Sequence, residues 1–216
     1  MDTALKIATA IYNNVNAGLK QTTNETISME QLEDHVIAER SNILKQLELS
    51  GKLEYRSLVQ SVNCIPVDCE SISLCCGIET FDNKLHFKIP KLATLVGSPL
   101  RFIGLTDRSM EFRYTIGGTW KNQMGGKFTK HLPYVWINAE MTDGFIFNPP
   151  TDDIAVISID AIFEDPRQVG EYACCPDTVD VSIPQWMASQ IITRLTGEYA
   201  SNYFKFNYRP NDQTGH

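Results

Sequence analysis

Residues 134–169, YVWINAEMTDGFIFNPPTDDIAVISIDAIFEDPRQV, constrain the fold more than any other stretch of the chain. The dipeptide Asp143-Gly144 follows Thr142 between two alternating apolar segments, a pattern typical of a hairpin whose turn holds glycine at positive φ. After the prolines of Asn148-Pro149-Pro150, the run 154–163 is mostly apolar on both of its period-two faces. This run therefore predicts a strand in the middle of a sheet, ended at Glu164-Asp165-Pro166 because proline lacks a backbone donor.

Three helices are predicted outside this stretch. Apolar side chains recur at helical spacing over residues 4–19. A second helix is expected to begin at Ser28, since Gln31 three residues later completes a capping box, and to end near Gly51, where a left-handed cap would lie. Pro184 opens a nearly all-round apolar helix that reaches about residue 204. A helix this apolar must pack on a sheet, on other helices or on another copy of the chain.

The middle of the chain carries further strand patterns, at residues 71–76, 85–89, 100–105 and 111–116. Asp82-Asn83 is predicted as a turn, residues 89–92 as the start of a short helix, and 106–109 as a four-residue hairpin loop. Residues 166–183 are predicted to form a loop. Together these elements predict an α+β fold, an antiparallel β-sheet or small sandwich packed with two N-terminal helices and one C-terminal helix.

The expected organisation is a single domain over residues 1–204, because a chain of this length can bury one such core. Its parts are a helical N-terminal part (4–51), a β-rich middle (53–169), the C-terminal helix (184–204) and a polar tail or arm (205–216).

Composition limits the possible partners. The formal net charge of -7 and the sequence pI of about 5.1 argue against general binding to nucleic-acid phosphates, which needs a concentrated positive field. A local group of basic residues either solvates a loop or forms a basic surface; its members are Arg108, Arg113, Lys121, Lys127 and Lys130. No secretory signal and no apolar run of spanning length is present, so a chain made and kept in a cytosol-like compartment, with no membrane partner, is expected unless it leaves within a larger particle.

Cysteines and catalytic motifs give no site. The six cysteines are expected to be free thiols and mostly small buried side chains, and they are Cys64, Cys69, Cys75, Cys76, Cys174 and Cys175. Their spacing includes no CxxC pair, so neither a metal nor a cofactor is predicted. Hydrolase, metalloprotease and phosphate-loop motifs are absent, and the paired carboxylates Asp152-Asp153 and Glu164-Asp165 stand beside prolines as ordinary turn residues. The sequence predicts no enzyme.

Two groups of residues are candidates for contacts with partners. Arg40 lies at the edge of the second helix's apolar stripe, either with its stem packed and its head in water or in an ion pair with a neighbouring subunit or an acidic residue of the sheet. The candidate subunit-interface residues are Arg40, Ile191, Tyr199 and Phe204. The candidate partner-ordered loop, bracketed by glycine pairs, contains Trp120, Lys121 and Lys127.

The order of three segments resembles a known family. These are IYNNVNAGLKQTTNETISMEQLEDHVIAERSNILKQL, DDIAVISIDAIFEDPRQV and IPQWMASQIITRLTGEYASNYF, followed by a polar tail. Together they resemble the ring proteins of crAss-like bacteriophages, which have the role of tail tubular protein A in T7-like phages. The resemblance implies a virion structural protein, a closed dodecameric ring between portal and tail that continues the DNA channel.

The resemblance also implies the partners and the location. The partners are other copies of the chain, the portal, neighbouring ring or tail proteins, and genomic DNA that passes without specific binding. The location is the tail or neck of the virion, after assembly in the host cytoplasm. Two alternatives stay open. A β-rich module could recognise a glycan or host protein if aromatic side chains were exposed on one face. An enzyme would need His35, His86 or His131 beside a carboxylate in a pocket.

Overall fold

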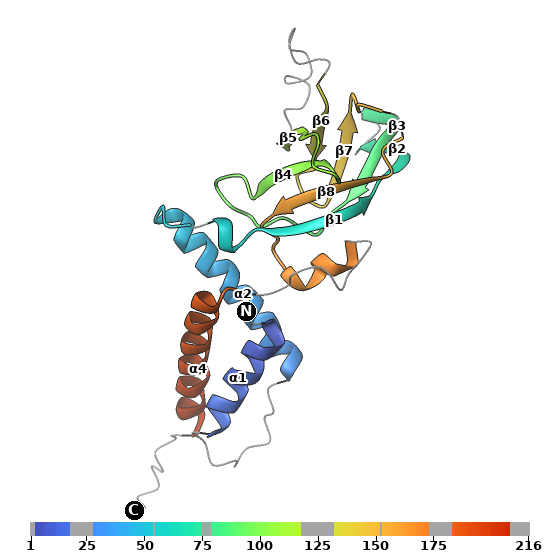
Figure 1. Ribbon diagram of the computed structural model, residues 1–216. Coiled ribbons are helices and arrows are strands. Elements are labelled where there is room, and N and C mark those ends of the chain that lie inside the picture. Colours follow the sequence, from blue (N-terminus) through green and yellow to red (C-terminus); the bar gives the residue numbers. More distant parts are fainter. Residues whose placement is uncertain are drawn as a thin grey trace, which may run out of the picture. The chain divides into compact units, whose positions relative to one another are not determined.

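The structure is a computed structural model that describes residues 3–17, 28–53, 55–74, 79–117, 132–151, 153–172 and 183–207 (Figure 1). The chain divides into two compact units, which we call the helical unit (Met1–Leu49 with Ser182–His216) and the β unit (Ser50–Val181). The predicted fold class is confirmed, because the fold is α+β with two N-terminal helices, one C-terminal helix and two sheets. A single α+β domain over residues 1–204 stays a prediction.

The helical unit contains α1 (Ala4–Ala17), α2 (Met29–Leu49) and α4 (Gln185–Asn207). Helix α1 packs against both other helices, and α2 also contacts α4. All three helices contribute buried apolar side chains, namely Ile7, Ile11, Leu32, Val36, Leu44, Met187 and Ile191. Burial of one such side chain stabilises a fold by roughly 1.5–3 kcal/mol, so this shared face accounts for the association of the helices.

The predicted start and end of α2 and the predicted start of α4 are confirmed, whereas α4 extends to Asn207, beyond the predicted residue 204. Ser28 Oγ accepts a hydrogen bond from the Gln31 N–H at 3.1 Å, which is one of the two hydrogen bonds of a capping box. After α2, Gly51 has a φ of 68°, the left-handed conformation that glycine adopts without strain. Pro184 directly precedes α4, and its carbonyl accepts the N–H groups of Met187 and Ala188 at 3.0 and 2.9 Å. The cap and the proline therefore set where these two helices begin.

In its described residues the β unit has eight strands, arranged in two sheets. They are β1 (Gln60–Pro66), β2 (Asp68–Leu74), β3 (Glu79–Lys88), β4 (Leu100–Leu105), β5 (Arg113–Ile116), β6 (Tyr134–Ile137), β7 (Asp143–Phe147) and β8 (Val156–Ala161), with 3-10 helices η1 (Tyr55–Ser57) and η3 (Pro166–Tyr172). The three-stranded sheet has the order β1-β8-β4 and is antiparallel. The five-stranded sheet has the order β2-β3-β7-β6-β5, in which only the β5–β6 pair is parallel.

An apolar core lies between the two sheets. Ile157 and Ile159 from β8 share it with Phe87, Val135 and Ile146 of the five-stranded sheet, so the predicted small sandwich is confirmed. Strand β8 is the middle strand of its sheet, as the run 154–163 predicts. The side chain of its residue 158, on the opposite face, is also buried, which explains why the sequence there is not simply alternating.

The predicted role of Gly144 is wrong. Asp143 and Gly144 open strand β7, and the turn of the β6–β7 hairpin lies before them, with Met141 at a φ of 61°. Gly144 is not at positive φ; a Cβ on it would lie 2.1 Å from Cζ of the buried Phe87 ring. The ring of Phe87 occupies the space where a side chain would stand. Glycine is therefore required here by packing and not by turn geometry.

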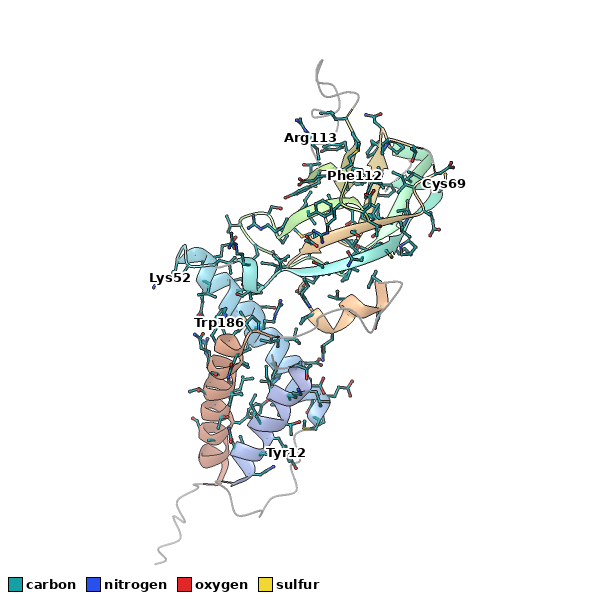
Figure 2. All side chains as sticks on the ribbon, viewed as in Figure 1. Tyr12, Lys52, Cys69, Phe112, Arg113 and Trp186 are labelled. Carbon is teal, nitrogen blue, oxygen red and sulfur yellow. The ribbon has the colours of Figure 1, made fainter. Side chains whose placement is uncertain are left out.

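The predicted pairing of residues 111–116 with 100–105 is right at its start, where Gly104 and Glu111 form an antiparallel bridge, and wrong from Arg113 onward. The Phe112 N–H still donates to the Ile103 carbonyl of β4 at 2.7 Å, but the Arg113 N–H donates to the Pro133 carbonyl, beside β6, at 3.2 Å. The strand thus crosses from one sheet to the other at this point. Figure 2 shows Phe112 within the β unit and Arg113 at its surface, in agreement with their burial.

Four smaller predictions need correction. Asp82-Asn83 lies within β3 and is not a turn. Residues 89–92 form no helix, because Leu92 instead makes a β-bridge with Phe163. Part of the predicted loop after Pro166 is the 3-10 helix η3. Of the cysteines in the described residues, Cys69 is exposed and Cys64 is half-buried, so the expected burial is wrong for Cys69.

Candidate functional site

A polar seam joins α2 to α4 beside their apolar contact. Tyr199 hydrogen-bonds His35 Nδ1, and the two rings stack with centroids 5.8 Å apart. Burial, with Glu198 as a smaller cause, raises the pKa of the Tyr199 hydroxyl, so it stays protonated near neutral pH. Four residues further along α2, Glu39 Oε1 lies 2.6 Å from Arg194 Nη1 of α4. The seam fixes how the two helices align along each other.

The ion pair of this seam is a charge contact of imperfect geometry. Although Arg194 lies close to Glu39 Oε1, that oxygen receives no well-aligned hydrogen bond from the described residues. Glu39 Oε2 accepts a longer bond from Asn42 Nδ2 at 3.3 Å. The short distance makes the contact attractive, and the poor alignment together with the half-exposed Arg194 keeps its contribution to stability modest.

The candidate subunit-interface residues lie in different environments. Arg40 is only 3% exposed, so the expectation that its head group lies in water is wrong, and an ion pair with a neighbouring subunit stays a prediction. Ile191 is completely buried, and Tyr199 uses its hydroxyl within the chain. Phe204 belongs to α4, but its side chain lies outside the described set. A role for the four in subunit contacts stays a prediction.

The candidate partner-ordered loop lies outside the described residues, because Trp120, Lys121 and Lys127 all fall between residues 117 and 132. Of the predicted basic group, Arg108 is already paired. Its guanidinium makes two hydrogen bonds of 2.8 Å to the Asp160 carboxylate and lies 5.0 Å from the centre of the Phe102 ring. The Asp160 hydrogen bond raises the pKa of Arg108, which stays charged.

A second polar cluster holds the β6–β7 turn. The Asp143 carboxylate accepts hydrogen bonds from Thr142 Oγ1 at 2.7 Å and Asn138 Nδ2 at 3.1 Å, and His86 Nε2 lies 3.1 Å from its other oxygen. Asn138 Oδ1 in turn accepts the N–H groups of Thr142 and Asp143. This closed network pins the turn to strand β3. The sequence reasoning missed it, although Asn and Asp five residues apart around a turn are residues that bind nearby backbone groups.

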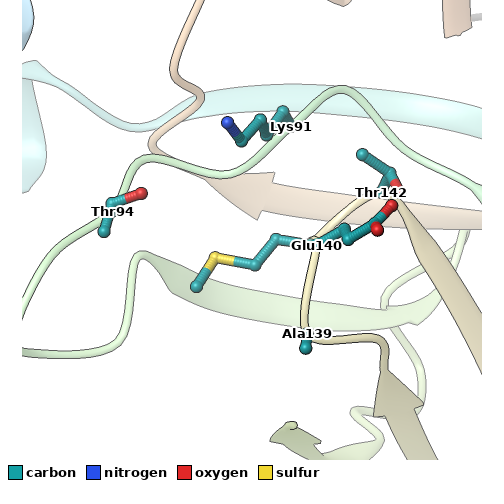
Figure 3. A pocket seen from close by; sticks show the side chains of 6 residues that line it. Lys91, Thr94, Ala139, Glu140 and Thr142 are labelled. Atoms are coloured by element: carbon teal, nitrogen blue, oxygen red, sulfur yellow. The ribbon is translucent and has the colours of Figure 1, made fainter.

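The turn forms one wall of an open hollow of about 500 Å³ (Figure 3). The other wall comes from Lys91 and Thr94, and Lys91 Nζ makes a 2.8 Å ion pair with Glu164. Met141 and Ala139 contribute apolar groups to the lining of the hollow, and the other lining residues are polar or charged. Nothing in its lining arranges a nucleophile beside a base, so the hollow shows no catalytic constellation.

The outer face of the five-stranded sheet carries a row of aromatic rings. Phe145 lies between His86, at 5.0 Å, and Trp136, at 5.5 Å, and the rings of Tyr134 and Phe147 are 6.5 Å apart. All five side chains are buried. A glycan-binding module needs such rings exposed, so this row does not supply the surface that the binding-module alternative requires.

The histidines in the described residues do not form a catalytic site. His86 stands beside a carboxylate, as the enzyme alternative requires, but it is 3% exposed and bound within the turn network. His35 is engaged with Tyr199, while His131 lies outside the described part. Across the described ranges no three His, Cys, Asp or Glu side chains are placed to hold a metal ion. Among the same residues, none of the helices has both the length and the apolar character to cross a membrane.

The fold and these clusters first define a class of protein. It is an α+β chain in which the polar clusters of the described residues stabilise the fold. The chain matches the family described as phage tail ring protein 2 over residues 7–214, nearly its whole length. The chain therefore belongs to this family of crAss-like phage ring proteins, which confirms the resemblance. Family membership points to a structural, non-enzymatic protein of the phage tail. A comparison with curated proteins finds no match.

Proposed function

We propose that the protein forms a closed homo-oligomeric ring, a dodecamer, that lies between portal and tail and continues the DNA channel. The family match over residues 7–214 carries this proposal. In this role each copy contacts two others, and the assembled ring contacts the portal or neighbouring ring and tail proteins. The ring is part of the virion and is assembled in the host cytoplasm. Head-to-tail contacts that close on themselves leave no free surface for further growth.

Exposed apolar side chains support an assembled state. Val96 of the β unit is 88% exposed and Leu49 of the helical unit is 80% exposed, while Leu5 and Trp186 are also open to solvent. Exposure of each of these side chains to water is unfavourable in an isolated subunit. Burial against a partner contributes roughly 25 cal/mol per Å² of apolar area to association. Single exposed side chains are common on monomers, so they support the proposal without deciding it.

The charge of the chain is suited to a channel wall. With a net charge of -7, the protein lacks the positive field that holds DNA by its phosphates. A genome can then slide through the ring without being trapped. The proposal fails in this respect if the lumen of an assembled ring is lined mainly by lysine and arginine.

The test is the mass of the purified full chain by light scattering, alone and mixed with isolated portal particles, followed by electron microscopy of the large species. We expect a closed ring, alone or stacked on the portal. Val96→Asp and Leu49→Asp each probe one unit, and Gln46→Asp, at an exposed position of α2, controls for the added charge. A monomer that persists in both conditions would overturn the proposal.

A further inference from the structure

Strand β6 has two different surfaces at its two ends. Before its start, Leu132 is 40% exposed, and the carbonyl of the next residue, Pro133, accepts the N–H of Arg113 at 3.2 Å, so Leu132 and Arg113 lie close together. After its end, residues 139–142 line the open hollow. Strand β6 lies between β5 and β7 in the sheet (Figure 1). The two surfaces are therefore held at opposite ends of one paired strand, at least about 13 Å apart by the rise of its four residues.

The surface at the start of β6 is apolar and positively charged. The side chain of Arg113 is exposed, as Figure 2 shows, and it makes no ion pair within the described part of the chain. Leu132 provides exposed apolar area beside it. A partner that covers both groups must offer an apolar contact to the leucine and a carboxylate to the guanidinium.

The hollow at the end of β6 offers these two groups. Met141 and Ala139 supply apolar lining to a space of about 500 Å³ (Figure 3). Lys91 also lines the hollow, but its charge is balanced by Glu164, 2.8 Å away. Glu140 is exposed and has no cation beside it among the described residues. The rim of the hollow therefore carries one uncompensated negative charge, which complements the positive charge of Arg113.

The turn that forms the hollow is fixed in advance. Met141 has a φ of 61°, a left-handed conformation that a residue other than glycine keeps only when its surroundings impose it. The Met141 N–H donates to the Asn138 carbonyl at 3.1 Å, and Asn138 Oδ1 accepts the N–H groups of Thr142 and Asp143 at 2.9 and 3.2 Å. A surface fixed in this way loses little conformational freedom when it binds a partner.

We propose that the hollow of one copy receives Leu132 of the next copy, with Leu132 against Met141 and Arg113 facing Glu140. The partner is a second copy of this chain, and the inference rests on the proposed ring. Because the giving and receiving surfaces differ and lie at opposite ends of β6, the contact is head-to-tail. Contacts of this kind close into a ring when every copy repeats them with the same rotation.

Mixing two charge-reversed chains tests the contact in the full protein. Arg113→Glu and Glu140→Arg each place like charges together, so each alone should show an apparent association constant about three- to tenfold below that of the wild-type chain at low salt. In an equimolar mixture, every contact between the two kinds of chain joins opposite charges, whichever chain gives its Leu132. A ring with an even number of copies can alternate them, so the mixture should assemble nearly as well as the wild-type chain.

This rescue by mixing is specific to a contact between copies. A folding defect, or an ion pair within one chain, would not be repaired by the other variant. Arg56→Glu is the matched control, because it reverses an exposed arginine of η1 that has no ion pair among the described residues, and it should assemble as the wild-type chain does. Leu132→Ser tests the apolar half without a change of charge and should lower the association constant by about three- to tenfold.

Assembly is measured by light scattering, alone and with isolated portal particles, and thermal unfolding shows that each variant is folded. If the wild-type ring forms and the folded charge variants assemble equally well alone, the contact is overturned and the ring stands. The same conclusion follows if both variants assemble poorly and mixing restores nothing. Failure of the wild-type chain to assemble, alone or with the portal, overturns the ring and this contact with it.

Discussion

Replacement of Gly144 by alanine tests the packing of the sandwich most directly. A Cβ at this position would lie 2.1, 2.5 and 2.7 Å from Cζ, Cε2 and Cε1 of Phe87. Ordinary contacts between such carbon atoms are about 3.5–4.0 Å, so the ring would have to move by more than an ångström. Phe87 is 1% exposed and belongs to the core between the sheets, so a shift of its ring displaces other core side chains. Overpacking of this kind costs roughly 1–3 kcal/mol, and we expect the upper part of that range.

The assay is reversible unfolding by heat and by urea, followed by circular dichroism. A loss of about 2–3 kcal/mol corresponds to a fall in Tm of roughly 4–12 °C for a chain of this size. The matched control is Gly197→Ala in α4, where a Cβ meets nothing within 4 Å. That change should stabilise the helix by up to about 1 kcal/mol, because alanine is the better helix former. The two glycine replacements are thus expected to have opposite signs.

Gly144→Asn separates the two explanations of this glycine. If Gly144 served a turn at positive φ, asparagine would be tolerated better than alanine. In a strand facing Phe87, the larger side chain should be worse than alanine. Unchanged stability in Gly144→Ala, or a more stable Gly144→Asn, would refute the packing argument.

Two further predictions concern hydrogen bonds and charge. Arg194→Ala should lower the free energy of unfolding by about 1 kcal/mol, because it leaves the mostly buried Glu39 without its cation while Arg194 itself is half-exposed. Adding Glu39→Gln to this variant should recover part of the loss. If Arg194→Ala costs as much in the Glu39→Gln chain as in the wild-type chain, the pairing is contradicted. The hydroxyl and then the N–H of Ser109 lower the pKa of Asp107, so Ser109→Ala should raise that pKa toward its ordinary value in an NMR titration. Because its pKa is lower in the folded state, the Asp107 carboxylate stabilises that state at pH values above its unfolded-state pKa. This stabilisation is lost as the pH falls through the folded-state pKa. Acid should therefore weaken this turn less in Ser109→Ala than in the wild-type chain.

The elements whose cause is local were predictable from the sequence. The Ser28 cap, the Pro184 start and the apolar run of β8 each depend on residues close together in the chain, and the structure confirms all three. Gly144 was misinterpreted because an Asp-Gly pair fits a hairpin turn equally well. Its actual cause is Phe87, fifty-seven positions earlier, which no local pattern reveals.

The candidate site was less predictable for the same reason. The crossing of the strand at Phe112 from β4 to β6 depends on long-range pairing, and so does the meeting of His86 with Asp143. Arg40 stands on the margin of the apolar stripe in the sequence, yet its whole side chain is buried. Periodicity indicates which face of a helix is apolar, but it does not indicate how far neighbouring elements extend over that face.

The helical unit is formed by two segments that lie at opposite ends of the sequence, and this affects how it can fold during synthesis. Helices α1 and α2 precede the β unit, whereas α4 follows it, and α1 contacts α4 directly. A ribosome must therefore produce the entire sandwich before the third helix exists. Until then, the apolar faces of α1 and α2 have only each other for cover, and closing the loop to α4 costs chain entropy that grows with its length. The β unit can fold while translation continues; the helical unit can be completed only afterwards.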